Sequence, residues 1–345
     1  MLPSCLPEPH LYLPGTGEPS LRWGIVGPGW IAGEFAKAVR AHTAQQIVAV
    51  ASRSPDRASA FAATHGIGLA LGSTEQLVTR PDVDVVYVAT PQSEHLAVGL
   101  AAIAAGKHVL IEKPFTVSAA AAKTLADAAR AAGVLVMEAM WSRYLPQTSV
   151  IRQLLADGVL GEVRTVLADH GQAITADPQH RLYRPELGGG ALLDLGIYPV
   201  QFASMVLGAP TRVTAVGGMT KTGVDAYSTL VLTHEQNAQS TLHTSIQART
   251  PMTAVIAGSE ATLSIDSIFY APTSFALSSA GDPFGPELTW SDPTGLKLFD
   301  GLSWEVTALA RFVGEGRTES PVHTLDETIS ILASIDEARA QVTAS

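Results

Sequence analysis

The chain has 345 residues, of which 46% are hydrophobic and 16% are charged, with 22 Lys and Arg against 32 Asp and Glu. This length favours two domains, and this composition excludes a disordered chain. The net charge of −10 argues against nucleic acid and anionic membranes as partners, since both are bound by basic surfaces. No uninterrupted apolar run approaches the ~18 residues of a membrane span, so we expect no membrane segment.

Residues 1–20 contain the single cysteine, Cys5, and five prolines. A lone thiol makes neither an internal disulfide nor a cysteine-based zinc site, which favours a reducing compartment and a cytoplasmic location. The prolines interrupt any apolar stretch, and the start is not basic, so the pattern of a signal peptide is missing. We expect residues 1–20 to be a disordered extension and Cys5 to be an exposed thiol without a function.

Residues 21–144 alternate between short apolar strands and helical periodicity. This rhythm predicts βαβ units, hence a parallel α/β sheet of the Rossmann type with helices on both faces. The predicted strands are residues 22–26, 46–51, 83–90, 108–111 and 134–138, and the predicted helices are residues 31–40, 55–65, 95–105 and 119–132.

Residues 145–345 have a different texture and predict a second domain. Alternating strands at residues 227–234 and 240–249 predict an antiparallel sheet. Leu230 and Leu232 face one side of it, whereas the other side is rich in Thr and Ser and is either solvated or packed on another subunit. The predicted helices of this part are residues 148–156, 303–313 and 325–341, besides an apolar helix that runs to Leu207.

The first strand leads into a G-x-G-x-x-A motif that opens a helix, which is typical of a dinucleotide-binding loop. In this interpretation Gly27 permits the tight turn, Gly29 lets a pyrophosphate approach the backbone, and Ala32 allows close helix–strand packing. The helix N-terminus supplies amide donors for the phosphates. The alternative is a purely structural glycine turn. The predicted cofactor residues of this loop are Gly27, Pro28, Gly29, Trp30 and Ile31.

The end of the second strand indicates which dinucleotide is bound. It reads Ser52-Arg53-Ser54 and lacks the acidic residue that binds the ribose 2′-hydroxyl of NAD. Arginine attracts a 2′-phosphate, so Ser52, Arg53 and the following Arg57 predict NADP rather than NAD. The alternative is that Arg53 is only a solvated surface residue.

Two further motifs carry candidate catalytic residues. Glu112-Lys113-Pro114 stands at the carboxyl end of a buried strand, where open α/β sheets bind ligands, although a surface ion pair is the alternative. Asp194 and Tyr198 are four residues apart on the apolar helix that follows three glycines. They are either a substrate-orienting acid and a proton-transferring phenol, or a structural tyrosine and an aspartate favoured by the helix dipole.

The combined motifs resemble the Gfo/Idh/MocA oxidoreductase family over about residues 21–341. The resemblance rests on residues 27–32, 89–91, 95, 106–109, 112–114 and 189–198. Within the family, residues 137–144 and 193–198 are most similar to the dimeric dihydrodiol dehydrogenases and NADP-dependent D-xylose dehydrogenases. Tyr198 stands where much of the family has His, a departure shared with the dihydrodiol group.

The resemblance implies a two-domain subunit, with NADP in residues 21–144 and a substrate-binding α+β domain in residues 145–345. The second domain would be a large open, mostly antiparallel sheet whose bare face joins subunits in a homodimer or other homo-oligomer. It also implies a cis Lys113–Pro114 bond. The further cofactor-binding residues that it implies are Thr90, Pro91, His95, Glu112 and Lys113.

The function we expect is an NADP-dependent dehydrogenase acting on a diol or sugar hydroxyl. Tyr198 would take the hydroxyl proton, assisted by Lys113 and positioned beside Asp194. The alternatives are a keto-sugar or inositol-type enzyme on the same fold, or a non-enzymatic NADP-sensing protein. No metal site is expected. Residues expected to line the substrate side are Trp141, which also suits a core position, Arg143 and Tyr183, and His170 and His180 could reach it.

Overall fold

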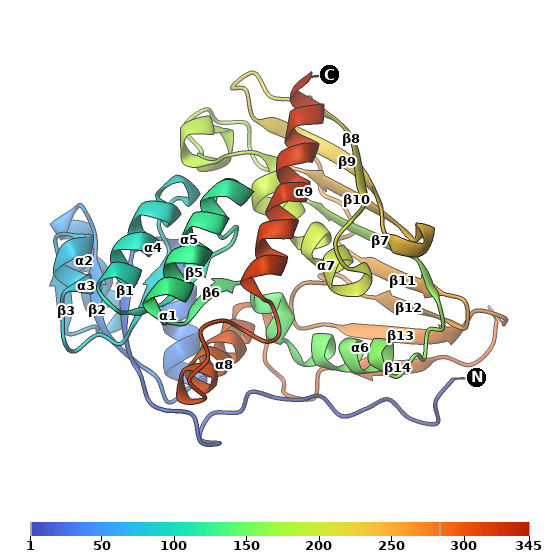
Figure 1. Ribbon diagram of the computed structural model, residues 1–345, viewed down its shortest axis with the longest axis horizontal. Coiled ribbons are helices and arrows are strands. Elements are labelled where there is room, and N and C mark those ends of the chain that lie inside the picture. The colour runs from blue at the N-terminus through green and yellow to red at the C-terminus, as the bar shows by residue number, and fades with distance from the viewer. Residues whose placement is uncertain (1, 283, 345) are drawn as a thin grey trace. The chain divides into compact units, whose positions relative to one another are not determined.

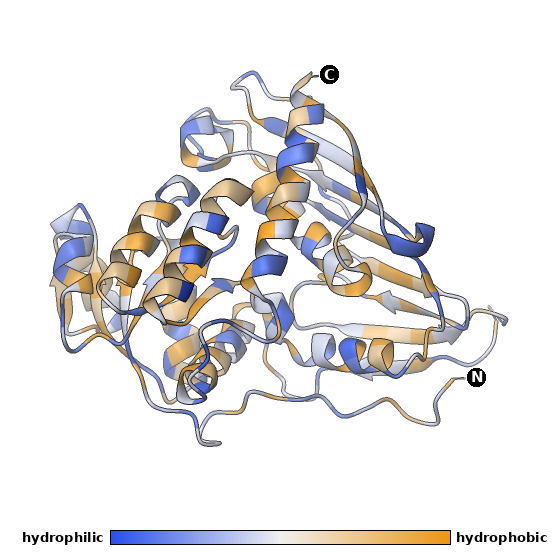
Figure 2. Cartoon of the chain, in the orientation of Figure 1, coloured by the Kyte–Doolittle hydropathy of each residue, from blue (hydrophilic) through white to orange (hydrophobic). Residues whose placement is uncertain are grey.

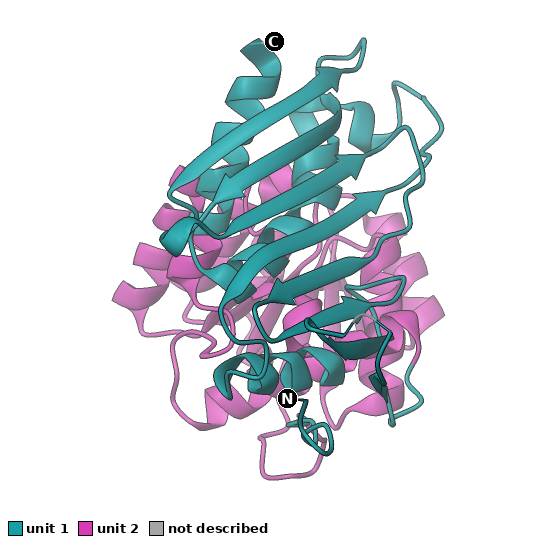
Figure 3. Cartoon of the chain, turned by 90° about the vertical axis from the view of Figure 1, so that its right-hand side faces the viewer, with its two compact units in different colours: residues 1–11, 145–296, 330–345 teal, residues 12–144, 297–329 magenta. Residues whose placement is uncertain are grey.

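The computed structural model describes residues 2–282 and 284–344, which divide into two compact units (Figure 3). The parallel-sheet unit comprises Tyr12–Tyr144 and Lys297–Ile329, and the mixed-sheet unit comprises Met1–Leu11, Leu145–Leu296 and Ser330–Ser345. The sequence predicted a single second domain from residue 145 to the end. Instead, the chain returns to the first unit at residues 297–329, because helix α8 (Leu302–Gly314) contributes its apolar face to the core of that unit.

The parallel-sheet unit is built on six parallel strands in the order β3-β2-β1-β4-β5-β6, which confirms the predicted Rossmann arrangement (Figure 1). Its strands are β1 (Arg22–Val26), β2 (Gln46–Ala51), β3 (Leu69–Leu71), β4 (Val85–Val88), β5 (His108–Glu112) and β6 (Val136–Ala139). The short β3 was not predicted, since three residues are too few for a periodic signal.

Helices pack against this sheet and bury its centre. Trp23, Phe35 and Tyr87 are fully buried, and the rings of Phe35 and Tyr87 stack with centroids 3.8 Å apart. Figure 2 shows hydrophobic residues along most of α4. The helices are α1 (Trp30–His42), α2 (Pro55–His65), α3 (Thr74–Val78), η1 (Gln92–Glu94), α4 (His95–Ala104), α5 (Ala119–Ala132), η2 (Trp141–Tyr144), η7 (Leu298–Gly301) and α8 (Leu302–Gly314).

The mixed-sheet unit holds an eight-stranded sheet in the order β14-β13-β12-β11-β7-β10-β9-β8. Only the β7–β10 pairing is parallel among the described pairs, which confirms a mostly antiparallel sheet. Its strands are β7 (Val163–Gly171), β8 (Arg212–Met219), β9 (Asp225–Thr233), β10 (Gln239–Ser245), β11 (Ala254–Gly258), β12 (Ala261–Ile265), β13 (Ser274–Ser279) and β14 (Leu288–Ser291).

The two faces of this sheet differ as the alternation in β9 predicts. Leu230 and Leu232 are buried, whereas Tyr227 and Val231 of the same strand are exposed. Leu167 of β7 and Val216 of β8 are exposed as well, and Val216 is 63% exposed. Figure 3 looks onto a face of the sheet that no helix of the unit covers. This bare face therefore carries apolar side chains among its threonines.

Helices cover the other face of the sheet. The helices of this unit are α6 (Pro146–Ala156), η3 (Arg181–Tyr183), η4 (Pro185–Leu187), the π-helix η5 (Leu192–Gly196), α7 (Ile197–Leu207), η6 (Glu235–Asn237) and the larger part of α9 (Leu325–Ala344). Of these, η6 does not cover the sheet, since it is the exposed turn between β9 and β10. The helical stretch Pro185–Leu207 has a mean hydropathy of 1.4, so by length and composition one stretch does reach the range of a membrane span, contrary to the sequence prediction. Because 83% of its apolar window is buried inside the protein, it corresponds to a core helix.

The N-terminal extension differs from its prediction. Its described residues run in extended conformation along the protein, and the backbone N–H of His10 donates to Ser149 Oγ at 2.8 Å. Tyr12 packs edge-on against Tyr144 and Phe312, with centroids 6.0 and 5.7 Å away. Prolines prevent a helix here but not an extended chain, which an anchoring aromatic side chain then holds in place. Cys5 is exposed, as expected.

Candidate active site

The glycine loop, residues 27–32, joins β1 to α1 and has the geometry of a dinucleotide site. Gly27 has φ of +96°, and a Cβ there would lie 2.7 Å from the Ala89 carbonyl oxygen, so this position requires glycine. A Cβ on Gly29 would meet only the Ala89 oxygen, at 4.0 Å. The protein itself thus leaves room at Gly29, which fits a pyrophosphate lying against the backbone.

Two polar features beside the glycine loop point in the same direction. Gly29 is the N-cap of α1, and no side chain caps the first turn of that helix. The hydroxyl oxygen of Thr90 is buried and has no hydrogen-bond partner among the described residues. A buried hydroxyl without a partner costs free energy, and helix amides favour anions. Both features fit a bound dinucleotide.

Aromatic side chains extend this side of the unit. Trp30 is 67% exposed and lies edge-on to Phe299, with the ring centroids 4.9 Å apart. Trp141 is buried, and its ring centroid lies 6.0 Å from that of Phe299. Ile31 is partly buried. The sequence analysis did not select Phe299, which lies in the short helix η7 between β14 and α8.

The end of β2 presents Arg53 to solvent. Its side chain is 85% exposed and forms an ion pair with Glu94, with 3.6 Å between Nη1 and Oε1. Ser52 Oγ accepts from the N–H of Ser54, so this serine shapes the turn. Arg57 reaches the Pro28 carbonyl oxygen only at 3.5 Å, beyond a good hydrogen bond. Arg53 and Arg57 are therefore both exposed cations at this strand end, and Glu94 is a partner of Arg53 that the sequence analysis missed.

His95 is buried and bridges the loops that follow β4 and β5. Its ring is buried, with Nδ1 3.0 Å from the Pro114 carbonyl oxygen and Nε2 3.0 Å from the Thr90 carbonyl oxygen. Burial lowers the pKa of His95. Pro91, directly after Thr90, accepts from the N–H of Glu94 and starts η1. The structure thus gives His95 a positioning role for the loops after β4 and β5.

Glu112 and Lys113 follow β5. The hydroxyl of Tyr87 donates to Glu112 Oε1 at 2.5 Å, and the backbone N–H of Lys113 donates to Oε2 at 3.2 Å. Glu112 is buried and anchors the strand end, while Lys113 is partly buried. The Lys113–Pro114 bond is cis, as the resemblance implied.

Arg143 does not have the substrate role that the sequence assigned. Its side chain is only 2% exposed, and it donates to both carboxylate oxygens of Glu327, at 2.6 and 3.2 Å. His323 lies between Glu327 and the buried Glu138, 3.3 and 2.8 Å from their oxygens. A buried guanidinium requires such a carboxylate. This network therefore stabilises the parallel-sheet unit, and Arg143 is structural.

One buried carboxyl of the same unit has no such support. Glu305, in α8, is fully buried, and neither side-chain oxygen has a hydrogen-bond partner among the described residues. Burial raises its pKa well above the usual value, and the negative charges of Glu112 and Glu138 add to the shift. The surroundings of Glu305 therefore favour the neutral form of its carboxyl.

In the mixed-sheet unit, three glycines start the helix that carries Asp194 and Tyr198. Gly190 has φ of +118°, and a Cβ there would lie 2.2 Å from Asp225 Oδ1. The buried Asp225 carboxylate accepts from the N–H of Leu192 at 2.6 Å and so closes the first turn. The glycine run is thus needed to let this carboxylate reach the helix start.

Asp194 lies in the π-helix η5, a wider turn that is frequent at functional sites. Its two oxygens accept from Nη1 and Nη2 of Arg181, both at 3.0 Å. Such paired bonds fix a carboxylate in the plane of the guanidinium. Asp194 is buried, whereas the Arg181 side chain is half-exposed. Arg181 was not selected from the sequence, since it precedes the glycines in an irregular segment.

Tyr198 follows at the start of α7 and is buried in an aromatic cluster with His170 and Tyr270. Its ring stacks on that of Tyr270, with centroids 4.2 Å apart and planes inclined by 23°. The centroid of the His170 ring is 5.5 Å away. We call these three residues the tyrosine cluster. The sequence singled out Tyr198 and weighed His170, but Tyr270 lies in a loop whose path could not be predicted.

Tyr183 and His180 do not join this cluster through any contact that the structure describes. The Tyr183 hydroxyl donates to the Ile174 carbonyl oxygen at 3.1 Å, and its ring belongs to a small core with Leu195 and Ile246. His180 accepts from the N–H of Leu182 and caps η3. The predicted substrate role of Tyr183 is therefore replaced by a structural one, because its hydroxyl and ring serve the fold.

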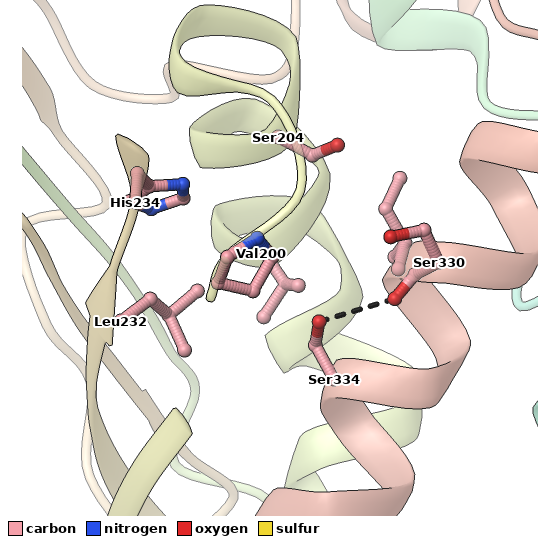
Figure 4. Close-up of a pocket in the computed structure, with 8 residues that line it drawn as sticks. Val200, Ser204, Leu232, His234, Ser330 and Ser334 are labelled. Carbon is pink, nitrogen blue, oxygen red and sulfur yellow. Dashed lines mark hydrogen bonds between the residues drawn. The ribbon is translucent and has the colours of Figure 1, made fainter. Parts of the chain in front are cut away.

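A small hollow in the mixed-sheet unit is not a second candidate active site (Figure 4). It is lined by Val200, Ser204, Leu232, His234, Ser330 and Ser334, among others. Both nitrogens of His234 are engaged, by the Gly208 carbonyl oxygen and by Ser240, and Ser334 donates to the Ser330 carbonyl oxygen. The hollow thus offers packing rather than chemistry. Across residues 2–282 and 284–344, no group of three or more metal-ligating side chains is found.

Comparison with known proteins agrees with this geometry. Residues 21–140 match the model of the Gfo/Idh/MocA oxidoreductase family with an NAD-binding Rossmann fold, and residues 148–264 match the C-terminal domain of the same family. The chain belongs to the Gfo/Idh/MocA family. It is an oxidoreductase of that family, and the predicted resemblance is confirmed.

Individual relatives lie within the same family. The chain is 36% identical to trans-1,2-dihydrobenzene-1,2-diol dehydrogenase of Xenopus laevis, over 93% of this chain and 98% of the relative. It is similar to a crystal structure of a 3-ketoreductase from Actinomadura kijaniata with NADP and TDP-benzene, with 28% identity, a TM-score of 0.82, and coverage of 94% and 98%. An aldose-aldose oxidoreductase from Caulobacter crescentus gives 26% identity, a TM-score of 0.81, and coverage of 94% and 97%.

Proposed function

We propose that the protein is an NADP-dependent dehydrogenase that oxidises a hydroxyl group of a vicinal diol or a sugar. The observation that carries the proposal is Tyr198, a buried phenol on the same helix run as a carboxylate that Arg181 holds in place. A phenol and an oriented carboxylate are suited to proton transfer from an alcohol. The dinucleotide loop in the other unit supplies the redox partner.

In the reaction, the substrate loses its O–H proton to Tyr198, and its C–H hydrogen leaves with both bonding electrons as hydride. When bound, NADP would supply the acceptor for that hydride, and the substrate would be left as a carbonyl product. A cation stabilises a phenolate, and Lys113 is assigned this role from the Glu-Lys-Pro motif. Asp194 orients the reacting hydroxyl.

NADP is the proposed cofactor because Arg53 is an exposed cation at the end of β2, and residues 51–54 at that strand end include no acidic residue. A guanidinium binds a phosphate bidentately, whereas NAD would find no acid for its 2′-hydroxyl there. The Actinomadura 3-ketoreductase was crystallised with NADP, which supports the same choice.

A second candidate function is reduction of a keto-sugar by the same residues in the reverse direction. The similarity to the Actinomadura 3-ketoreductase favours it. Tyr198 would then donate its proton to the carbonyl oxygen as hydride arrives on the carbon. Turnover that proceeds only with NADPH and a keto-sugar would favour this direction.

We also propose a homodimer formed through the bare face of the eight-stranded sheet, and a cytoplasmic location. The exposed Leu167, Val216, Tyr227 and Val231 support the first proposal, since clustered apolar side chains mark an interaction face. Val216→Glu should then shift the protein from dimer to monomer in analytical ultracentrifugation. A wild-type monomer would refute the dimer.

The experiment that tests the function is the appearance of NADPH absorbance when NADP⁺ is mixed with trans-dihydrodiols, D-xylose, D-glucose or myo-inositol. Turnover with a dihydrodiol or an aldose supports the dehydrogenase and identifies its substrate class. Turnover with myo-inositol alone favours an inositol-type enzyme. NADPH binding without turnover in either direction, with keto-sugars included, favours the sensor alternative and refutes the proposal.

A further inference from the structure

Tyr270 is the closest aromatic neighbour described for Tyr198, and its own position is fixed from two sides. Its ring is stacked on Tyr198 at 4.2 Å and lies edge-on to Phe269, with centroids 5.3 Å apart and planes at 89°. Phe269 is buried and packs against Phe202 of α7. The loop that carries Tyr270 is thus tied back to the helix that carries Tyr198.

His170 holds the hydroxyl end of the same ring. Its Nδ1 lies 3.2 Å from the Leu195 carbonyl oxygen, which can only accept, so in the neutral imidazole Nδ1 carries the proton. Nε2 is then an acceptor and receives the Tyr270 hydroxyl at 2.9 Å. The side-chain nitrogen of Gln172 lies 3.0 Å from the same ring nitrogen. Tyr270 is therefore a hydrogen-bond donor whose direction is set by a buried histidine.

The protonation state of Tyr270 supports this arrangement. Burial raises the pKa of its hydroxyl, so the ring stays a neutral phenol at working pH. A neutral phenol can donate continuously to His170 and can support Tyr198 without competing with it as a base. His170 belongs to β7, Leu195 to η5 and Tyr270 to the loop before β13. The strand, the helix start and the loop thus meet at one histidine.

We propose that Tyr270 is a positioning residue for Tyr198. Its hydrogen bond to His170 holds the Tyr270 ring in place against Tyr198. The stacked ring limits the rotation of Tyr198, and the bond to His170 keeps that ring from sliding. Proton transfer requires the phenol oxygen within hydrogen-bond reach of the substrate, so a small displacement of Tyr198 lowers turnover. The proposal rests on the proposed function, because it assumes that Tyr198 transfers the proton.

The test compares two substitutions of Tyr270 in the full-length protein, on whichever substrate of the panel turns over. Tyr270→Phe keeps the ring and loses the bond to His170, so kcat should fall about threefold to tenfold. Tyr270→Leu loses the ring as well, so kcat should fall about tenfold further. KM should change less than kcat in both variants, and the Kd for NADPH should stay at the wild-type value.

His170→Asn removes the acceptor while Tyr270 remains, and it decides the matter if Tyr270→Leu does not fold. It should lower kcat as much as Tyr270→Phe does, and the double variant should lose no more than either single variant, because all three lack the same bond. Additive losses would overturn the role of His170.

Phe275→Leu is the matched control. Phe275 stacks on Trp290 with centroids 5.4 Å apart, so the substitution removes a comparable pair elsewhere in the same unit. It should lower the melting temperature and leave kcat unchanged. Folded Tyr270→Leu protein with wild-type kcat, or with no more loss than the control, would overturn the proposal. If Tyr198→Phe itself retains turnover, the proposed function fails, and this inference fails with it.

Discussion

The glycine loop and the tyrosine cluster show two ways of building a site. At the glycine loop, backbone amides and the absence of a Cβ at Gly29 make the binding surface, and few side chains are needed. In the tyrosine cluster, side chains make the site, and each one is held by another. The first kind of site is local in sequence, whereas the second is assembled from segments that lie far apart.

The difference explains what each region tolerates. A backbone site keeps its shape as long as the strand, turn and helix form. A side-chain site depends on each partner, and Tyr270 and His170 stand 100 residues apart in the chain. We therefore expect substitutions in the two regions to separate cleanly into effects on cofactor binding and effects on turnover.

The largest expected effect tests that separation directly. Tyr198→Phe removes the hydroxyl that we propose to transfer the proton, so kcat should fall by about 10²–10⁴-fold while the Kd for NADPH is unchanged. Tyr183→Phe is the control, since it removes the hydroxyl of another buried tyrosine in the same unit, one that bonds only the Ile174 carbonyl oxygen among its described contacts. Steady-state kinetics and fluorescence titration measure the two quantities. A Tyr198→Phe enzyme with full turnover would contradict the expected separation between effects on cofactor binding and effects on turnover.

The second effect concerns the cofactor alone. Arg53→Ala removes an exposed cation at the end of β2, so NADPH should bind about 10- to 100-fold more weakly, with little change for NADH. Arg164→Ala removes an exposed arginine from the mixed-sheet unit and should alter neither affinity. Equal losses for both dinucleotides would refute the assignment of the 2′-phosphate to Arg53.

The same contrast decides how much could be predicted from the sequence. The glycine loop and the end of β2 are contiguous motifs, and the parallel sheet follows from apolar runs, so both were predicted. Asp194 and Tyr198 were found because one helix carries both. Arg181 and Tyr270 were missed, since both lie in irregular segments whose path depends on packing. Arg143 and Tyr183 were assigned to the substrate because the sequence does not reveal their buried partners.

Glu305 of the parallel-sheet unit allows a test through the pH dependence of protein stability. The pKa of this buried carboxyl is raised in the folded protein, so its contribution to stability is present below the unfolded pKa of about 4.3 and is lost as pH rises toward the folded pKa. Glu305→Gln removes the titration and keeps the shape. The variant should therefore melt higher than the wild type at pH 8, by about 2–4 °C if the effect is about 1 kcal/mol.

The difference should shrink as pH falls toward the unfolded pKa of about 4.3 and vanish well below it, where the wild-type carboxyl is neutral in both states. Differential scanning fluorimetry over this range measures it, and kcat should stay at the wild-type value, because Glu305 has no contact with the tyrosine cluster that the structure describes. A pH-independent difference in melting temperature would show that Glu305 is not a buried neutral acid. A large loss of kcat would show that side chains of the parallel-sheet unit contribute to turnover as well.

The smallest expected effect concerns Glu94, which forms an ion pair with Arg53 at 3.6 Å. A 2′-phosphate must displace this carboxylate, so the ion pair acts against NADPH binding. Exposed ion pairs are weak, and Glu94→Gln should therefore tighten NADPH by only about two- to fivefold, with a smaller change for NADH. Because salt screens such pairs, the gain should fall as ionic strength rises.

Glu75→Gln is the control for Glu94→Gln, since it removes the same charge from an exposed position of the same unit. If the gain comes from releasing Arg53, it should vanish in an Arg53→Ala background. A gain that persists there would be a general effect of net charge on the binding of an anion. Unchanged NADPH affinity in the single variant would mean that Glu94 does not compete with the 2′-phosphate for Arg53.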